Sequence, residues 1–109
     1  MDIDYCIDKN SFIFKPLFNE SIDKYIDIIS NYKKLIFSNY NDVEICVRAS
    51  KKYESSYNMK YTYSKFNQPL DNSLSQLVNL THLTFGAKFN QPLDNSINNL
   101  VNLTHLTMG

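Results

Sequence analysis

A near-identical repeat is the feature that most constrains the fold of this 109-residue chain. Residues 66–86 and 89–109 align at an offset of 23, and 17 of the 21 aligned positions are identical. Periods of about 20–29 residues are typical of solenoids, because a unit of that size cannot enclose a core alone and buries its apolar side against its neighbours. The repeat therefore predicts stacked units that share one core.

The apolar spacing within each copy predicts one short strand per unit. Each copy closes with the leucine-rich-repeat pattern L-x-x-L-x-L, in which a turn ends in a strand whose alternate residues point inward. We expect Leu83, Phe85, Leu106 and Met108 to face the core. The predicted class is α/β: a short leucine-rich-repeat-like solenoid with a parallel sheet of short strands and an N-terminal helical cap.

The segment FNQPLDNS, which opens each copy, supplies the residues of a turn. Pro69 and Pro92 fix their own φ and exclude a continuing strand. The Asp-Asn-Ser run that follows offers side chains that bond nearby backbone amides. We expect Asn67 and Asn90 to point inward and to satisfy backbone groups where the chain bends.

Two helical segments are predicted from local patterns. Apolar residues at helical spacing predict an amphipathic helix over about residues 20–32, with Asn19 as its N-cap, covering the open end of the stack. These apolar residues are Ile22, Tyr25, Ile26 and Ile29. A single helical turn is expected after Ser73, because Ser73-x-x-Gln76 fits a capping box.

The repeat pattern persists in weaker form upstream. The spacing of Tyr32, Leu35 and Phe37 is similar to that of the clear copies and predicts a divergent strand. Residues 59–63 are expected to form the strand before the first clear copy, and residues 42–54 fit either a helix, which we favour, or a strand.

The composition changes along the chain and predicts two regions. All eight Tyr and all but one of the basic residues precede Phe66. We therefore divide the chain into residues 1–57, an N-terminal cap region with the amphipathic helix and a degenerate repeat, and residues 58–109, which hold the clear repeats.

The repeat resembles a known family. FNQPLDNS followed by LVNLTHLTFG is similar to the FNIP repeat, a relative of leucine-rich repeats found in social amoebae and in giant viruses that infect amoebae. The resemblance covers two full units, residues 66–109. It implies an interaction scaffold without catalytic activity of its own.

Some members of that family carry an F-box before the repeats. Asp42-Val43 and residues 47–53 are distantly similar to the end of one. However, the spacing from Pro16-Leu17, which would open it, is too long, and the apolar run at residues 35–37 does not fit. An adaptor that binds a Skp-type subunit of a ubiquitin ligase is therefore kept as an alternative.

Charge and cysteine content exclude several classes of partner. Eleven Lys and Arg balance eleven Asp and Glu, so the chain lacks the net positive charge that nucleic acid or anionic lipid requires. No apolar run approaches the ~20 residues of a membrane span. Cys6 and Cys46 are too few for a disulfide scaffold, which indicates thiols in a reducing compartment. We expect a cytoplasmic protein, in the host cell if the source is viral.

The repeated polar residues do not predict an enzyme. His82 and His105 share one outward register, but two imidazoles supply only two metal ligands, and no carboxylate stands at a neighbouring outward strand position. Asp71 and Asp94 recur at the same offset as turn residues, whereas acid-base catalysis needs two different environments. We expect no catalytic residue, metal or cofactor.

Two kinds of partner are predicted. The main hypothesis is that the outward strand positions bind another protein. These positions are Lys34, Ile36, Lys60, Thr62, His82, Thr84, His105 and Thr107. Alternatively, the last repeat is followed by no polar capping unit, so its strand edge pairs with a second copy or belongs to a longer array.

Overall fold

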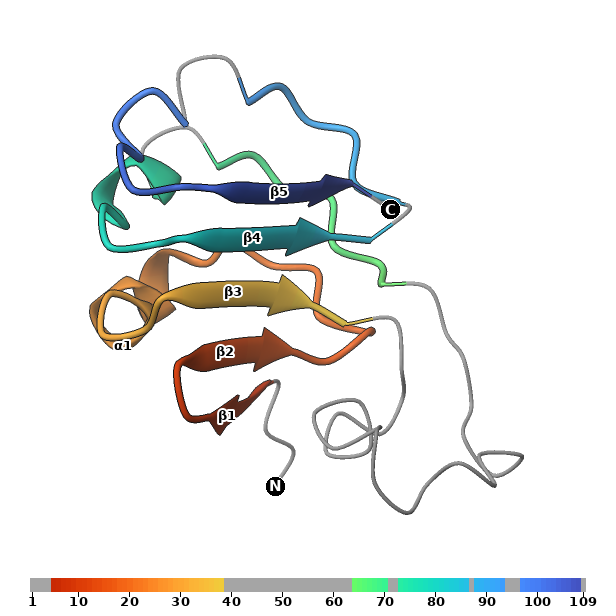
Figure 1. Ribbon diagram of the computed structural model, residues 1–109. Helices are drawn as coiled ribbons and strands as arrows, with labels where there is room; N and C mark the ends of the chain where they lie inside the picture. The colour runs from red at the N-terminus through yellow and green to blue at the C-terminus, as the bar shows by residue number, and fades with distance from the viewer. Residues whose placement is uncertain (1–4, 39–63, 71–72, 87, 94–96, 109) are drawn as a thin grey trace.

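The protein folds around one five-stranded sheet with the strand order β1-β2-β3-β4-β5 (Figure 1). The computed structural model describes residues 5–38, 64–70, 73–86, 88–93 and 97–108. The strands are β1 (Tyr5–Asp8), β2 (Ser11–Phe14), β3 (Lys34–Phe37), β4 (His82–Phe85) and β5 (His105–Met108). The helical turns are η1 (Asp23–Tyr25), α1 (Ile26–Ile29) and η2 (Leu74–Gln76). β1 pairs antiparallel with β2, and the other three pairings are parallel.

The parallel strands pair with their repeats in register. Leu35 of β3 lies opposite Leu83 of β4, and Leu83 lies opposite Leu106 of β5. The two copies of the repeat therefore lie side by side, and the prediction of short parallel strands is confirmed. Because the register is constant, equivalent residues form straight rows across the sheet.

β3 belongs to a further unit that sequence inspection found only in part. Residues 18–38 align with residues 66–86 at a constant offset of 48, which brings Phe18 to the position of Phe66 and Leu35 to that of Leu83. We call residues 18–38 the first unit, residues 66–86 the second and residues 89–109 the third. Most positions of the first unit differ from the copies, but its apolar positions are retained.

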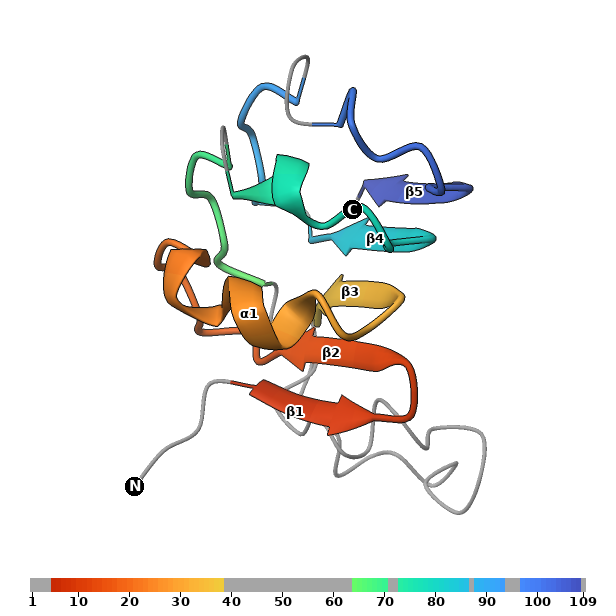
Figure 2. The ribbon, with the colours of Figure 1, turned by 90° about the vertical axis from the view of Figure 1, so that its left-hand side faces the viewer.

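The predicted N-terminal helix is shorter than expected and is not an end cap. It is reduced to η1 and α1, whose Ile26 and Ile29 are buried, as is Ile22 just before them. Asn19 does not cap it, because the Asn19 Oδ1 accepts a hydrogen bond from the backbone N–H of Asn67, at 2.9 Å. Figure 2 places α1 on one face of the sheet, whereas β1 forms the end of the sheet.

The other local predictions meet different outcomes. The helical turn after Ser73 forms as η2, but without the capping box: the Ser73 hydroxyl donates to the carboxylate of Asp23 in the first unit. The predicted strand at residues 59–63, the segment 42–54 and the boundary at residue 57 lie outside the described residues.

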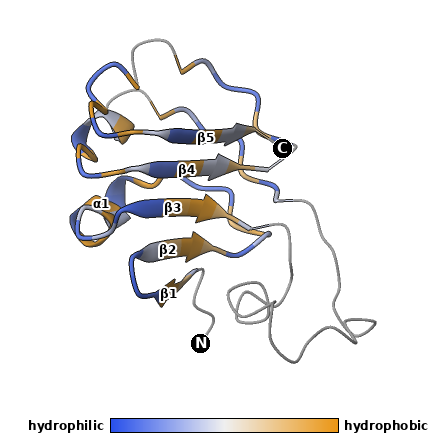
Figure 3. Ribbon diagram, in the orientation of Figure 1, coloured by the Kyte–Doolittle hydropathy of each residue, from blue (hydrophilic) through white to orange (hydrophobic). Residues whose placement is uncertain are grey.

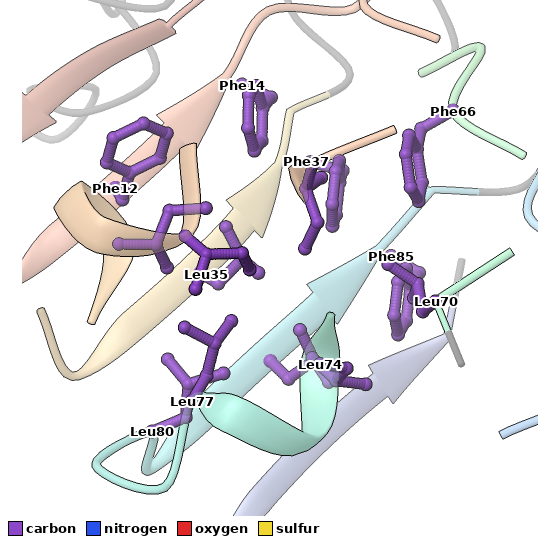
Figure 4. Close-up of a cluster of buried hydrophobic side chains, with 14 of the residues drawn as sticks. Phe12, Phe14, Leu35, Phe37, Phe66, Leu70, Leu74, Leu77, Leu80 and Phe85 are labelled. Carbon is purple, nitrogen blue, oxygen red and sulfur yellow. The ribbon is translucent and has the colours of Figure 1, made fainter. Parts of the chain in front are cut away.

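The core contains a column of phenylalanine rings at the strand ends. Phe37 stacks on Phe14 at 5.2 Å between ring centroids and on Phe85 at 5.4 Å, with planes within 11° of parallel. All three rings are buried, and Figure 4 shows them beside the leucines of the core. This column ties β2, β3 and β4 together at one end of the sheet.

A second column opens the units. Phe66 lies 5.8 Å from both Phe18 and Phe89, and its ring plane is within 7° of each. Each of these rings also stacks on a ring of the first column, at 4.0 to 4.1 Å. The Phe that opens a unit therefore packs on the aromatic residue that ends the strand before it.

The core thins toward β5. Leu83 and Phe85 are fully buried, but Leu106 and Met108 are 41% and 51% exposed. Their register with Leu83 and Phe85 places them on the predicted face. The prediction of the face is right and that of burial is wrong, because within the described residues β5 is an edge strand with no unit beyond it.

Candidate functional site

The candidate site is the face of the sheet opposite to α1 and η2, which we call the outer face (Figure 2). Since strand residues alternate between the two faces, the register gives two rows of outward positions. The first row is Asp8, Ser11, Lys34, His82 and His105, and the second is Cys6, Ile13, Ile36, Thr84 and Thr107. Six of the eight predicted partner-binding residues stand in these rows; Lys60 and Thr62 lie outside the described residues.

From β3 to β5, exposure along the rows increases. Lys34, His82 and Thr84 are half-buried, as is Ile36, whereas the residues of β5 are exposed. Figure 3 shows that β3 and β5 begin with hydrophilic residues. Among β3, β4 and β5, the most accessible part of the outer face is therefore polar and lies on β5.

The β2 end of the outer face is different. Ile13 stands between Cys6 and Ile36 in the second row, and it is only 2% exposed. It is not a member of the main core cluster, which lies on the other side of the sheet. Here Ile13 and Ile36 make the second row apolar, and Ile13 is not accessible to a partner.

The two histidines stack in parallel. The ring centroids of His82 and His105 are 4.2 Å apart, and the planes differ by 4°. The Thr81 hydroxyl donates to the Lys33 carbonyl at 3.2 Å and lies 2.8 Å from the His82 Nδ1. Because a hydroxyl has one proton, it accepts the hydrogen bond from Nδ1–H, and the neutral His82 keeps Nε2 as an acceptor.

The same arrangement holds the second ring. The Thr104 hydroxyl donates to the Thr81 carbonyl at 3.1 Å and lies 2.8 Å from the Nδ1 of His105. Each histidine is therefore oriented by the threonine before it. The pair presents two Nε2 acceptors side by side on adjacent strands.

The environment of His82 favours its neutral form. Partial burial lowers the pKa of His82 below its ordinary value of 6.5, and the neighbouring His105 and Lys34 lower it further. Both neighbours would place positive charge beside a His82 cation. At neutral pH, His82 is an uncharged hydrogen-bonding group beside the ammonium of Lys34.

The predicted turn asparagines act between units. The Asn67 Oδ1 accepts a hydrogen bond from the backbone N–H of Asn90 at 2.7 Å, rather than from a group of its own bend. Asn67 is half-buried and Asn90 is exposed. Pro69 and Pro92 are exposed at the turns.

Sequence reasoning missed the partners of these asparagines. The Gln91 Nε2 donates to the Asn67 carbonyl and to its Oδ1, at 3.3 and 3.2 Å. Gln68 makes the same two contacts to Asn19, at 3.3 and 3.0 Å. The Phe-Asn pair at Phe18 repeats the start of the clear copies, and this match could have indicated the contacts between units.

The described residues offer little for metal chemistry. Within them, no group of three or more His, Cys, Asp or Glu side chains is placed to hold a metal ion. His82 and His105 alone would supply two ligands, fewer than the three or four that zinc takes from proteins.

Comparison with known families decides the classification. The FNIP Repeat family matches residues 66–109, the second and third units. The chain is an FNIP repeat-containing protein. No match was found among curated proteins or among solved structures. The first unit lies outside the matched range, yet its Asn19 and Phe18 make the contacts that Asn67 and Phe66 make one unit later.

Among the helices that the structure describes, none has the length and apolar character to cross a membrane.

Proposed function

We propose that this FNIP repeat protein is a non-catalytic scaffold, a short solenoid that binds another protein through the outer face of β3, β4 and β5. The observation that carries the proposal is the row formed by Lys34, His82 and His105, in which each unit contributes one polar side chain at the same position. The core lies on the other side of the sheet, so the positions of this row add little to the buried core.

The chemistry of the row indicates what a partner offers. Parallel strands lie about 4.8 Å apart, so the row presents one group at each such step. The Nε2 atoms of His82 and His105 accept hydrogen bonds, and the Lys34 ammonium favours a carboxylate. We infer a polypeptide segment that crosses the strands, with donors over the histidines and an acidic side chain at Lys34.

The affinity of this face is expected to be moderate. Interface hot spots are enriched in Trp, Tyr and Arg, and none of these occurs in the two rows that cross the described sheet. Binding would gain strength from several weak contacts repeated along the row.

A pair of matched double variants tests the proposal. The purified chain serves as bait in cross-linking capture, followed by measurement of affinity for the recovered protein. His82→Ala with His105→Ala removes two stacked outer-face side chains. Val78→Thr with Val101→Thr changes two exposed residues that share the same 23-residue offset but precede the strands. Loss of affinity in the first variant alone supports the proposal, and equal affinity in both variants contradicts it.

A further inference from the structure

Three nitrogen-bearing side chains stand in line on neighbouring strands of the outer face. Lys34 of β3 pairs in register with His82 of β4, and His82 pairs with His105 of β5. The imidazoles of His82 and His105 are stacked, with ring centroids 4.2 Å apart and planes within 4° of parallel. We call these three residues the basic row.

The threonine contacts decide which atom of each imidazole takes up a further proton. The Thr81 hydroxyl donates to the Lys33 carbonyl, so it accepts from the Nδ1–H of His82. The Thr104 hydroxyl is placed in the same way between the Thr81 carbonyl and the His105 Nδ1. Because Nδ1 already carries a proton in both neutral rings, acid adds the next proton at Nε2. Protonation therefore turns each Nε2 from an acceptor into a charged donor and leaves the contacts that orient the ring intact.

The described groups around the basic row offer no nearby counter-ion. Lys34 and, just before it, the exposed Lys33 add positive charge on β3. In the first row, Ser11 separates Lys34 from Asp8, the one acidic residue at an outward position of the described strands. Asp8 is three strand spacings from His82, about 14 Å, which exceeds the Debye length of about 8–10 Å in ordinary salt. The second-row neighbours on the same strands are uncharged: Ile36, Thr84 and Thr107.

Acid therefore gathers like charges in the basic row. Partial burial, followed by the neighbouring His105 and Lys34, lowers the pKa of His82, in agreement with the lack of a balancing anion among the described residues. A carboxylate over the row would supply that anion. Hydrogen bonds from a charged N–H to a carboxylate are about twice as strong as those between neutral groups.

We propose that acid switches the basic row from a surface of neutral acceptors to a binding site for the carboxylates of an acidic polypeptide. At neutral pH the Lys34 ammonium alone carries charge toward the partner. Below about pH 6.5, the ordinary histidine range, the Nε2–H groups of His82 and His105 join it as charged donors. The inference rests on the proposed function, because it assigns a ligand chemistry and a pH dependence to the same outer face.

The amount of charge favours a polypeptide over nucleic acid or lipid. The basic row holds three positive charges at most, in a chain whose eleven Lys and Arg are balanced by eleven Asp and Glu. Proteins that bind DNA commonly neutralise about six to ten phosphates, and segments that bind anionic lipid carry about four to eight Lys or Arg. A short run of Asp or Glu matches three charges.

The test measures binding of the full chain to a rhodamine-labelled hexaglutamate peptide by fluorescence anisotropy at constant ionic strength. Glutamate has an ordinary pKa of about 4.3, so the peptide stays ionised between pH 7.5 and 5.5. We expect its affinity to rise as the pH falls, by up to about tenfold per pH unit for each proton taken up on binding. Absence of binding, or an affinity that does not rise on acidification, would overturn the proposal.

Matched variants separate the basic row from the general charge of the chain. His82→Gln with His105→Gln should remove the pH dependence, and Lys34→Gln should weaken binding at every pH. Lys24→Gln changes an exposed lysine of η1, which runs into α1 on the other face of the sheet (Figure 2), and should leave both unchanged. If the double glutamine variant keeps the pH dependence of the natural chain, the effect belongs to other groups and the proposal is wrong.

Proton NMR provides a readout that a merely structural role would not move. The Cε1–H resonance of His82, assigned with the His82→Gln variant, gives the pKa of this residue with and without hexaglutamate. The peptide should raise that pKa, because coupling between two binding events acts equally in both directions. An unchanged pKa would contradict the proposal.

The proposed function is tested separately by the capture experiment at neutral pH. A partner that is lost in the His82→Ala, His105→Ala variant, together with no acid-dependent binding of hexaglutamate, would overturn the switch and leave the scaffold standing. Equal affinity of both double variants for the captured partner would overturn the scaffold itself.

Discussion

The Asn67 Oδ1 accepts a hydrogen bond from the backbone N–H of Asn90 at 2.7 Å, and so joins the turns of two successive units. Asn19 makes the equivalent bond to Asn67. Backbone amides at a turn that packs against another turn need acceptors, and here these hydrogen bonds lie at exposed positions. The asparagine that follows the opening Phe supplies one acceptor per unit, and this hydrogen bond explains why Asn recurs at that position.

Asn67→Ala is expected to destabilise the protein by about 0.5–1.5 kcal/mol, because it removes the acceptor of the Asn90 N–H at an exposed position. Asn90→Ala, the same change one unit later, is expected to change the free energy of unfolding by at most about 0.5 kcal/mol, because the exposed Asn90 side chain makes no hydrogen bond to the described residues. Urea unfolding of both variants gives the two values. Equal values would show that the bond between units does not contribute.

Asn19→Ala is expected to cost about as much as Asn67→Ala, about 0.5–1.5 kcal/mol, if residues 18–38 act as a true unit. The Asn19 side chain accepts bonds from the Asn67 N–H and the Gln68 amide. The same urea experiment measures it. A negligible effect would mean that the first unit is only loosely joined to the second.

Leu83→Ala is expected to cost about 2–5 kcal/mol, because Leu83 is fully buried and its truncation leaves a cavity. Leu106→Ala should cost clearly less, since Leu106 is 41% exposed. Thr84→Ala, on the outer face, should also cost less. Thermal and urea unfolding compare the three, and equal costs for Leu83 and Thr84 would contradict the assignment of inner and outer faces.

Stability should fall as the pH drops through and below about 6.5. The pKa of His82 is lowered in the folded protein, so the unfolded chain binds more protons than the folded one below the ordinary histidine pKa. Acid therefore favours unfolding, and the loss is complete once the pH passes below the lowered folded pKa. His82→Gln should reduce the pH dependence of the unfolding midpoint between pH 7 and 5, and an unchanged dependence would assign it to other groups.

The sequence predicts the pairing of the repeat strands better than the structure at the two edges of the sheet. The near-identity of the clear copies is enough to place Leu83 and Leu106 in register, because a constant offset permits one parallel pairing. It does not predict β1 and β2, since Phe12 and Phe14 lie before any copy. It overstates the burial of Leu106, because exposure at an edge depends on what lies beyond it.

The helix between β2 and β3 shows a second limit. Ile22, Ile26 and Ile29 fit a helical period, yet the same residues occupy the positions of Leu70, Leu74 and Leu77 in the second unit. Leu74 lies in η2, and Leu70 and Leu77 lie in irregular segments before and after it rather than in a long helix. The apolar spacing of a turn in this repeat and that of an amphipathic helix overlap, and only alignment with the clear copies separates them. For the candidate site, the rows follow from the register, but the threonine that orients each histidine requires coordinates.

The most direct test of the account is a disulfide between the first and second units. In a background with Cys6→Ser and Cys46→Ser, Ile36→Cys is combined with Thr84→Cys, its partner across β3 and β4. Neighbouring strands lie about 4.8 Å apart, within the Cα separation of about 4.4–6.8 Å that disulfides require. A shifted pair, Lys34→Cys with Thr84→Cys, serves as the control. Stacked units in the described register predict that mild oxidation cross-links the first pair, detected by mass spectrometry of the digest, and leaves the shifted pair reduced. A cross-link in the shifted pair, or none in the first, would contradict the account.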